Sequence, residues 1–425
     1  MVVWLVTIGE PLPIDGKNVR LHRTGMLADL LFEKGHTVVW WTSTFDHFKK
    51  AQRYKKDTTV DVGSGYKIEL LYSMSYRSTV SIARTISHCR VAKKFSKLIR
   101  NEQKPDLILC SFPTVLLSYH AAMYGAAAEV PVVLDARDMW PDIFLNLVPK
   151  WSRRFVHLLL MPSFRKAKKA FEQAYSITGM TPDFIKWGLR YAGREKTGLD
   201  RDFPFGYRSR VPDNAALKGA DSFWKSYGID SRQNPFIVCF FGTIGRQFEI
   251  ETVIQAAREL QAKKIPVSFI LCGDGDRLEL YKDQTDGLAN VMFPGWVGEA
   301  EIWSLMRKAA VGLAPYIDTV DFQSSIPNKI IEYLSAGLPV VSSLRGQVSD
   351  ILEEHNCGAT YDGKIAGDLV DTIVRLYEDT GARDRMSKNA ARLFEKRFTA
   401  EKVYSEMIDY LVAVYNSKSR TGEKS

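Results

Sequence analysis

Residues 314–342 of this chain read A-P-Y-I-D-T-V-D-F-Q-S-S-I-P-N-K-I-I-E-Y-L-S-A-G-L-P-V-V-S. The pattern predicts the end of a strand, a polar loop, a short helix, a Gly-Leu-Pro turn and a second buried strand. A buried strand, a helix and another buried strand form the repeating unit of parallel sheets. This segment therefore predicts an α/β fold.

Two features of the short helix indicate a nucleotide ligand. Glu332 interrupts an otherwise apolar helix face, and a buried charge needs a partner or a function. The sequence Pro-Asn-Lys at 327–329 opens the helix, where free backbone amides favour an anion. This arrangement suits a nucleoside diphosphate whose phosphates lie on the amides and whose ribose hydroxyls meet Glu332.

Composition predicts a two-domain protein of the cytoplasm. The chain has 425 residues, 45% of them hydrophobic and 25% charged, which is ordinary for a globular protein. Five cysteines without C-x-x-C spacing are expected to be reduced, with no disulfide and no metal site. The sequence contains no uninterrupted apolar run long enough to cross a bilayer, so no spanning helix is expected.

Positive charge is concentrated in the first half of the chain. Residues 1–210 hold 33 Lys and Arg against 19 Asp and Glu, a net charge of +14, and the remainder holds 25 against 30, a net charge of −5. Basic and aromatic residues alternate over 47–56 and 151–169, which favours peripheral contact with the anionic inner face of the plasma membrane. A solvated basic helix face is the alternative. No nucleic-acid-binding module is recognisable, so nucleic acid is not an expected partner.

The order of predicted strands and helices divides the chain into four parts. Apolar strands alternate with helical segments up to about residue 193 and again from 236, and each series predicts a doubly wound parallel sheet. We expect an N-terminal acceptor-binding domain over 1–205, a linker or irregular edge over 206–235, a nucleotide-sugar-binding domain over 236–398, and a final helix over 399–416 that crosses back to the first domain. The two domains are expected to face a central cleft, beyond the carboxyl ends of their strands.

In the first domain, the loops after two strands carry candidate residues. The loop from Gly9 leads into a helix expected over 19–34, and Gly16, Arg20 and Arg23 suit a phosphate. A solvated loop is the alternative. The sequence D-A-R-D-M-W-P-D follows the strand that ends at 134. There Asp135 or Asp138 is a candidate to orient a hydroxyl or accept its proton, with Arg137 as charge partner, and a salt-bridge network is the alternative.

In the second domain, three loops follow strands and contain glycine. F-G-T-I-G-R lacks the G-x-G-x-x-G and P-loop patterns, but Gly242 and Gly245 allow a close backbone approach, with Arg246 adjacent. We predict a diphosphate contact there, with a tight turn as the alternative. The turns at Gly273 and before Val297 are weaker signals for a ligand, and the second could help to hold a base.

The motifs, taken in order, resemble the retaining glycosyltransferases of family 4, and the chain is most similar to their bacterial surface-polysaccharide subgroup. The resemblance rests on I-P-N-K-I-I-E-Y-L-S-A-G-L-P-V-V-S, the D-A-R-D-M-W-P loop, F-F-G-T-I-G and L-C-G-D-G-D. It implies the GT-B fold, in which two Rossmann-like domains face a cleft. It also implies front-face transfer of a sugar through an oxocarbenium-like transition state.

The resemblance implies a role for individual residues. Glu332 matches the residue that binds the donor ribose, and Ser324 stands where many members carry a second Glu that touches the donor sugar. Further donor-site positions are Gly242, Thr243, Gly273, Val297, Asn328 and Lys329. Gly16 matches the glycine-rich acceptor loop, and Arg137 with Asp138 matches a His-Asp loop near the transferred sugar.

The sequence thus predicts a retaining, metal-independent hexosyltransferase that moves a sugar from a nucleoside-diphosphate donor, of UDP or GDP type, to a lipid-linked or polysaccharide acceptor of a surface glycan. Arg246, Lys329 and the amides at 327–329 are expected to stabilise the leaving diphosphate. No cofactor is expected, because the nucleotide sugar is a substrate. The alternatives are a nucleotide-sugar 2-epimerase of the same fold and a non-catalytic scaffold for polysaccharide assembly.

Overall fold

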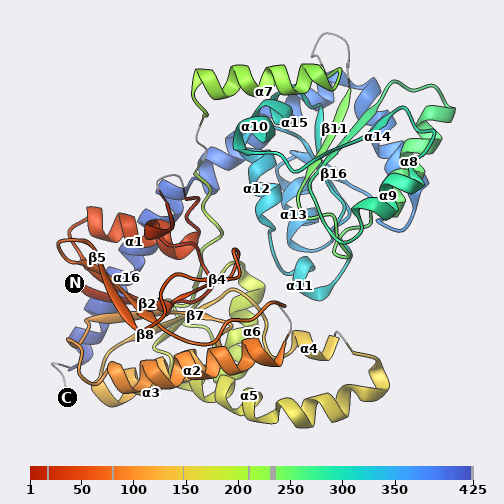
Figure 1. Ribbon diagram of the computed structural model, residues 1–425. Helices are drawn as coiled ribbons and strands as arrows, with labels where there is room; N and C mark the ends of the chain where they lie inside the picture. Colours follow the sequence, from red (N-terminus) through yellow and green to blue (C-terminus); the bar gives the residue numbers. More distant parts are fainter. Residues whose placement is uncertain (17–18, 79–80, 147, 209–210, 230–235, 423–425) are drawn as a thin grey trace. The chain divides into compact units, whose positions relative to one another are not determined.

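The computed structural model describes residues 1–16, 19–78, 81–146, 148–208, 211–229 and 236–422 (Figure 1). The chain forms two compact units. Unit 1 comprises Met1–Gly206 and Ala400–Ser425, and unit 2 comprises Tyr207–Thr399. Each unit contains its own sheet with helices packed against it, so the predicted α/β class is confirmed.

Unit 1 contains an eight-stranded sheet with the order β10-β9-β8-β7-β1-β2-β6-β5. Neighbouring strands are parallel except β5 and β6, which are antiparallel. A separate hairpin pairs β3 with β4. The strands are β1 (Val2–Val6), β2 (Thr37–Ser43), β3 (Phe45–Asp46), β4 (Ala51–Gln52), β5 (Thr58–Gly63), β6 (Tyr66–Leu71), β7 (Leu107–Phe112), β8 (Val132–Ala136), β9 (Ser176–Gly179) and β10 (Arg201–Asp202).

Helices cover both faces of this sheet. Apolar residues of α2, α3, α5 and α6 form one core cluster against the sheet, and those of α1 and α16 form another. Two-sided burial explains why the central strands are almost continuously apolar. The helices are η1 (Pro13–Asp15), α1 (Arg23–Glu33), α2 (Ile82–Leu98), α3 (Val115–Ala128), α4 (Ile143–Asn146), η2 (Lys150–Ser152), α5 (Arg153–Gln173), α6 (Pro182–Ala192) and α16 (Ala400–Gly422).

Unit 2 contains a six-stranded parallel sheet with the order β13-β12-β11-β14-β15-β16. The strands are β11 (Ile237–Phe241), β12 (Ser268–Cys272), β13 (Val291–Gly295), β14 (Val311–Ala314), β15 (Val340–Ser342) and β16 (Gly358–Thr360). The helices are α7 (Asn214–Ser226), α8 (Ile250–Ala262), α9 (Leu278–Gln284), α10 (Glu299–Lys308), α11 (Val320–Gln323), α12 (Asn328–Ser335), α13 (Gln347–Glu354), α14 (Ala366–Glu378) and α15 (Thr380–Arg397). Strand order reverses between β11 and β14, and ligands of such sheets bind beyond the strand ends at this point.

The expected linker over 206–235 requires a correction. It contains α7, a regular helix that packs on α10, where Trp224 Nε1 donates a hydrogen bond of 2.9 Å to the carbonyl oxygen of Glu301. Residues 209–210 and 230–235 of the segment lie outside the described residues. Sequence reasoning missed α7 because its apolar positions are few and Gly and Pro lie on either side of it.

Two helix boundaries also differ from expectation. The helix expected over 19–34 begins only at Arg23, so Arg20 lies before it rather than in its first turn. The last helix extends to Gly422 instead of ending at 416. It packs within unit 1, where Tyr410 donates or accepts a hydrogen bond of 2.7 Å with Ser176 of β9.

Candidate functional site

The short helix α12 holds the main candidate site of unit 2. Pro327 precedes it as the N-cap residue, and residues 329–334 are buried. Gly337, with a φ of 64°, then reverses the chain toward β15. Most of α12 is packed against the rest of unit 2. Its first turn, which contains Lys329, lies next to the loop that follows β11.

Lys329 is a buried ammonium group directed at that loop. Only 8% of the residue is exposed. Its Nζ lies 4.6 Å from the ring centre of Phe240, 4.9 Å from that of Phe241 and 5.7 Å from that of Phe248. Burial lowers the pKa of Lys329 to about 8, although the charge of Glu332 acts in the opposite direction. A cation held in this way is stabilised when an anion binds beside it.

Two glycines allow the loops after β11 and β12 to meet this cation. A Cβ on Gly242 would stand 2.7 Å from Lys329 Nζ, and the φ of Gly242 is 155°. A Cβ on Gly273 would stand 1.8 Å from the carbonyl oxygen of Gly242. The amide of Gly242 donates a hydrogen bond of 3.0 Å to the carbonyl oxygen of Cys272. Glycine is therefore required at both positions.

Glu332 lies one turn after Lys329 on the same face of α12. The residue is 9% exposed. Its charge favours the protonated form of Lys329, and burial together with that charge raises the pKa of Tyr316. The helix thus places a carboxylate and an ammonium group side by side at the switch point of the sheet.

The other predicted donor-site residues lie at the same edge of the sheet, because each follows the carboxyl end of a strand. Asn328, Thr243 and Arg246 are exposed, whereas Val297, after β13, is 8% exposed. Ser324 is half-buried at the end of α11, where its amide donates to the carbonyl oxygen of Val320 at 3.1 Å. The structure therefore brings these segments to one place in unit 2.

A buried ion network lies at the carboxyl ends of β1 and β8 in unit 1. Arg23 donates to both carboxylate oxygens of Asp135, at 2.9 and 3.0 Å, and both side chains are fully buried. Arg137 donates to Asp135 at 2.7 Å and to Glu10. Burial acts to raise the pKa of Asp135, but the charges of Arg23 and Arg137 outweigh it and hold that pKa well below its usual range.

This network bears on the predicted roles of Arg23, Asp135 and Arg137. Arg23 was expected to contact a phosphate, yet its remaining donors bind the carbonyl oxygens of Phe203 and Pro204 at 2.8 Å each. Asp135 belongs to β8 rather than to the following loop, and two guanidinium groups keep it ionised and enclosed. It is therefore no candidate base. Arg137 belongs to the same network, so the salt-bridge alternative holds for this pair.

The remaining acceptor-side candidates are more accessible. Asp138 follows β8, is half-buried, and accepts a hydrogen bond of 2.8 Å from the amide of Met139. Arg20 is exposed before α1, and Gly16 is exposed with a φ of 152°. Lys17 and Asn18 of the same loop lie outside the described residues. Asp138 is thus the carboxylate of the D-A-R-D segment that a substrate can reach.

Glu10 is a site residue that sequence reasoning missed. It is 9% exposed and accepts hydrogen bonds from the amide and the hydroxyl of Thr24, at 2.9 and 2.7 Å, in addition to the one from Arg137. Glu10 follows Gly9 in a loop, and the neighbouring sequence gives no indication that its side chain is buried. Its partners come from α1 and from the segment after β8, which only the fold brings together.

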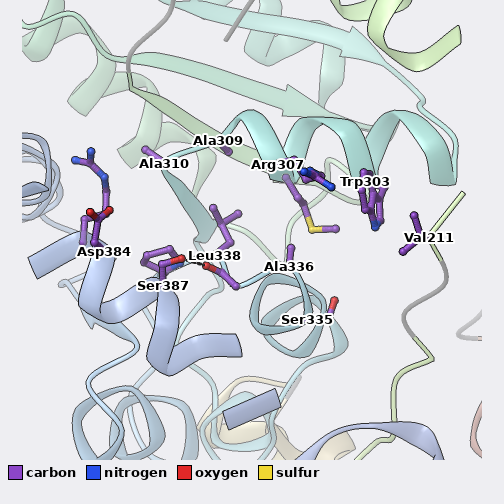
Figure 2. Close-up of a pocket in the computed structure, with 14 residues that line it drawn as sticks. Val211, Trp303, Arg307, Ala309, Ala310, Ser335, Ala336, Leu338, Asp384 and Ser387 are labelled. Carbon is purple, nitrogen blue, oxygen red and sulfur yellow. Dashed lines mark hydrogen bonds between the residues drawn. The ribbon is translucent and has the colours of Figure 1, made fainter. Parts of the chain in front are cut away.

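A cavity of about 510 Å³ opens at the opposite end of α12 (Figure 2). Ser335 and Leu338 line it together with Arg307 of α10 and Ser387 of α15. It adjoins the residues that precede β14 and β15, at the amino ends of the strands. Ligands of doubly wound sheets bind beyond the carboxyl ends, so this cavity is distinct from the Lys329 site. Within the described parts of the chain, no three His, Cys, Asp or Glu side chains gather as a potential metal site.

Comparison with known proteins matches part of unit 2 to a known family. Residues 235–379 match the family described as Glycosyl transferases group 1, and this range contains all of the candidate donor-site residues. The alpha-D-kanosaminyltransferase of Streptomyces kanamyceticus is 26% identical over 192 residues, which is 44% of this chain and 47% of that protein. The chain thus spans about half the length of the curated relatives that it matches.

Solved structures resemble the whole chain. Sucrose-phosphate synthase from Thermosynechococcus elongatus superposes with a TM-score of 0.69 at 16% identity, covering 98% of this chain and 99% of that one. The Anabaena protein HepE, in complex with UDP and glucose, superposes with a TM-score of 0.64 at 16% identity, covering 97% and 100%. The chain therefore has the GT-B fold, and residues 235–379 of its second unit match the family described as Glycosyl transferases group 1.

Proposed function

We propose that this protein is a retaining, metal-independent glycosyltransferase. It would move a sugar from a nucleoside-diphosphate donor to a hydroxyl of a lipid-linked or polysaccharide acceptor in surface-glycan synthesis. The observation that carries the proposal is Lys329, a buried ammonium group with ring contacts, directed at the glycine loop after β11. A diphosphate is the group that such a site favours.

The donor would extend along the carboxyl edge of unit 2. Its diphosphate meets Lys329, Arg246 and the first amides of α12, and its ribose hydroxyls meet Glu332. The base lies near Val297, and Ser324 faces the sugar. HepE supports a UDP-type donor, because that neighbour of the same fold is described with UDP and glucose bound.

In the transfer step, the bond between the anomeric carbon and the phosphate oxygen breaks while the acceptor oxygen bonds to the same face of that carbon. The acceptor proton passes to the departing phosphate oxygen, so the charges balance without a metal. Lys329, Arg246 and the helix amides stabilise the negative charge that develops on the diphosphate. Asp138 would orient the acceptor hydroxyl.

Peripheral membrane association is part of the same proposal. The start of α5 and the preceding η2 expose four large apolar side chains: Trp151, Phe155, Leu158 and Leu159. Six cations follow on the same helix or lie among these residues: Arg153, Arg154, Arg165, Lys166, Lys168 and Lys169. Apolar residues flanked by cations suit an anionic lipid surface. None of the described helices combines the length and hydropathy needed to span a bilayer.

The donor site is tested by thermal shift with UDP, GDP and their sugars, followed by turnover with the donor that binds. One nucleotide sugar is expected to raise Tm in a concentration-dependent way. Glu332→Gln should weaken its binding about tenfold, since hydrogen bonds to a charged group contribute roughly 1.5–3 kcal/mol. Unchanged binding by Glu332→Gln contradicts the assigned ribose contact.

Turnover separates the proposed activity from the two alternatives. A transferase releases nucleotide and forms a glycoside with the anomeric configuration of the donor, and it does so only with an acceptor. Conversion of one nucleotide sugar into its 2-epimer without an acceptor favours an epimerase. Binding without turnover by any donor and acceptor tested favours a scaffold.

A further inference from the structure

A second cavity, of about 430 Å³, lies in unit 1 beside the carboxyl ends of β7 and β8. Its walls come from α2, α3, α4 and α5 and from the loop after β8. Apolar side chains form most of the lining, among them Ile82, Val115, Leu116, Trp140, Phe144 and Leu160. The volume lies within the range of about 300–1,000 Å³ that is typical of ligand pockets.

One wall of this cavity carries one cation and one imidazole. Arg84 and His88 line it, and the Arg84 guanidinium lies 5.0 Å from the ring centre of Trp140. Arg84 also hydrogen-bonds with Tyr76, which stands 6.2 Å from His88 between ring centres. The apolar cavity is therefore joined directly to a polar cluster.

The cluster continues from Tyr76 to the turn between β3 and β4. The Tyr76 hydroxyl lies 2.9 Å from His47 Nδ1, and Lys50 Nζ lies 3.5 Å from the same nitrogen and 5.4 Å from the centre of the Tyr76 ring. Lys50 Nζ therefore stands beside both the Tyr76 ring and the His47 imidazole.

Two cations, Lys50 and Arg84, act on the imidazoles of the cluster. Burial, with the charges of Lys50 and Arg84, lowers the pKa of His47 to about 4. Burial, with the charge of Arg84, lowers the pKa of His88 to about 3. Burial and Arg84 likewise lower the pKa of Lys50. At neutral pH both imidazoles are therefore uncharged, and Lys50 contacts uncharged groups.

The neighbouring carboxylate is already engaged. Asp46 acts on His47 and Lys50 through its charge. Its Oδ1 accepts hydrogen bonds of 2.9 Å from the amides of Phe48 and Lys49, and its Oδ2 lies 3.4 Å from Arg53. An anion that enters the cluster would therefore meet the charges of Lys50 and Arg84.

We infer that this cavity binds a phosphate or diphosphate carried on a hydrocarbon chain. The phosphate lies among Lys50, Arg84 and His47, and the chain fills the apolar cavity. The identification of this ligand with the acceptor carrier rests on the proposed function, whereas its binding does not. The position beside the strand ends of unit 1 agrees with where ligands of such sheets bind.

The bilayer is a ready source of such a ligand. Leu160 and Ser163 of α5 line the cavity, and the exposed residues Phe155, Leu158 and Leu159 lie on the same helix. A membrane offers the required chemistry in two forms, a polyprenyl phosphate or diphosphate and a glycerophospholipid. The experiment separates these two sources.

Calorimetric titration of the full chain uses farnesyl diphosphate and lysophosphatidic acid as the two amphiphiles, with farnesol and inorganic diphosphate as controls. At least one amphiphile is expected to bind tenfold or more tightly than either control, because the charged group and the chain each contribute. Stronger binding of farnesyl diphosphate identifies an isoprenoid ligand. Failure of both amphiphiles, or equal binding of farnesol or diphosphate, overturns the inference.

Two variants test the two halves of the site. Lys50→Ala should weaken binding of the preferred amphiphile about tenfold or more, and Phe144→Ala should weaken it in proportion to the lost apolar contact. Lys97→Ala, an exposed lysine of α2, is the matched control and should bind as the wild type does. Lys50→Gln replaces Lys50→Ala if the latter lowers Tm. Equal affinity of the Lys50 and Lys97 variants contradicts the phosphate assignment.

Binding of UDP, or of the nucleotide that unit 2 prefers, is measured on the same samples. Amphiphile binding without nucleotide binding contradicts the proposed function and leaves the cavity assignment standing. Nucleotide binding without amphiphile binding contradicts the cavity assignment alone.

Discussion

Lys329 Nζ lies 2.7 Å from the point at which a Cβ would stand on Gly242. A buried cation and a bare stretch of backbone therefore meet at the switch point of the sheet in unit 2. The backbone can approach the cation this closely because Gly242 carries no side chain.

Gly242→Ala should reduce nucleotide affinity at least tenfold. The added Cβ displaces the Lys329 ammonium group, and a φ of 155° disfavours any residue with a side chain. Titration calorimetry with UDP or GDP measures the effect. Gly287→Ala is the matched control, because Gly287 also has a positive φ, of 78°, but has no atom within 4 Å of the added Cβ. If both variants bind nucleotide equally, the contact with Lys329 does not matter for binding.

Lys329→Met should leave the free protein as stable as the wild type or more stable, while nucleotide affinity falls at least tenfold. The methionine avoids the cost of burying an ammonium group and keeps most of the packing against the rings of Phe240 and Phe241. Thermal unfolding with and without nucleotide separates the two effects. A large fall in the Tm of the free protein, with affinity retained, would assign Lys329 a structural role.

Nucleotide affinity should fall as pH rises through about 8. The pKa of Lys329 is lowered from 10.5 to about 8 by burial, so its positive charge is lost above that pH. Burial raises the pKa of Cys272 to about 12 and also raises that of Cys239, so both thiols stay uncharged over this range. Affinity measured from pH 6.5 to 9.5 should decline in the wild type and stay level in Lys329→Met. Parallel profiles in the two proteins would exclude Lys329 as the titrating group.

The same pKa shift predicts the effect of pH on stability. Between pH 8 and 10.5 the unfolded chain binds more protons than the folded one, so the contribution of Lys329 to the free energy of unfolding rises with pH in that window. The full difference corresponds to roughly 3 kcal/mol. Denaturant unfolding of the wild type and Lys329→Met measures it. The gap between the two proteins should narrow as pH increases.

Asp135→Asn should destabilise unit 1 by about 3–5 kcal/mol, because it leaves the buried guanidinium of Arg23 without its counter-charge. Lys186→Ala is the control, since the Lys186–Asp183 pair is exposed and such pairs contribute about 1 kcal/mol or less. Denaturant unfolding measures both variants. A loss below about 1 kcal/mol for Asp135→Asn would contradict the importance of the network.

Replacing Leu158 and Leu159 together by serine should reduce binding to anionic vesicles about tenfold or more and leave Tm unchanged. The two side chains are 60% and 63% exposed, so their removal costs little packing. Sedimentation with phosphatidylglycerol vesicles at two salt concentrations measures the effect. Ser152→Ala, beside the helix start, should bind as the wild type does. Membrane association would be contradicted if the wild type bound vesicles equally well at every lipid charge and salt concentration.

The local sequence pattern was enough to predict many of the strands and helices of this protein. Apolar runs predicted the central strands, because a strand buried on both faces must be apolar along its length. The segment from Ala314 to Ser342 predicted α12 and the burial of Glu332 for the same reason. Helix α7 and the edge strand β5 were missed, since their apolar residues are few and alternate with exposed ones.

Tertiary packing settled what each charged residue does. Arg23 looked like a phosphate ligand in the sequence, yet it is enclosed with Asp135, which lies 112 residues away along the chain. Lys329 was predicted from its place at a helix start, but its burial among phenylalanine rings and its approach to Gly242 depend on how β11 and α12 pack. Periodicity in a sequence reports which face of an element is buried. It does not indicate which distant helix or strand covers that face. The environment of a charged side chain depends on that covering element.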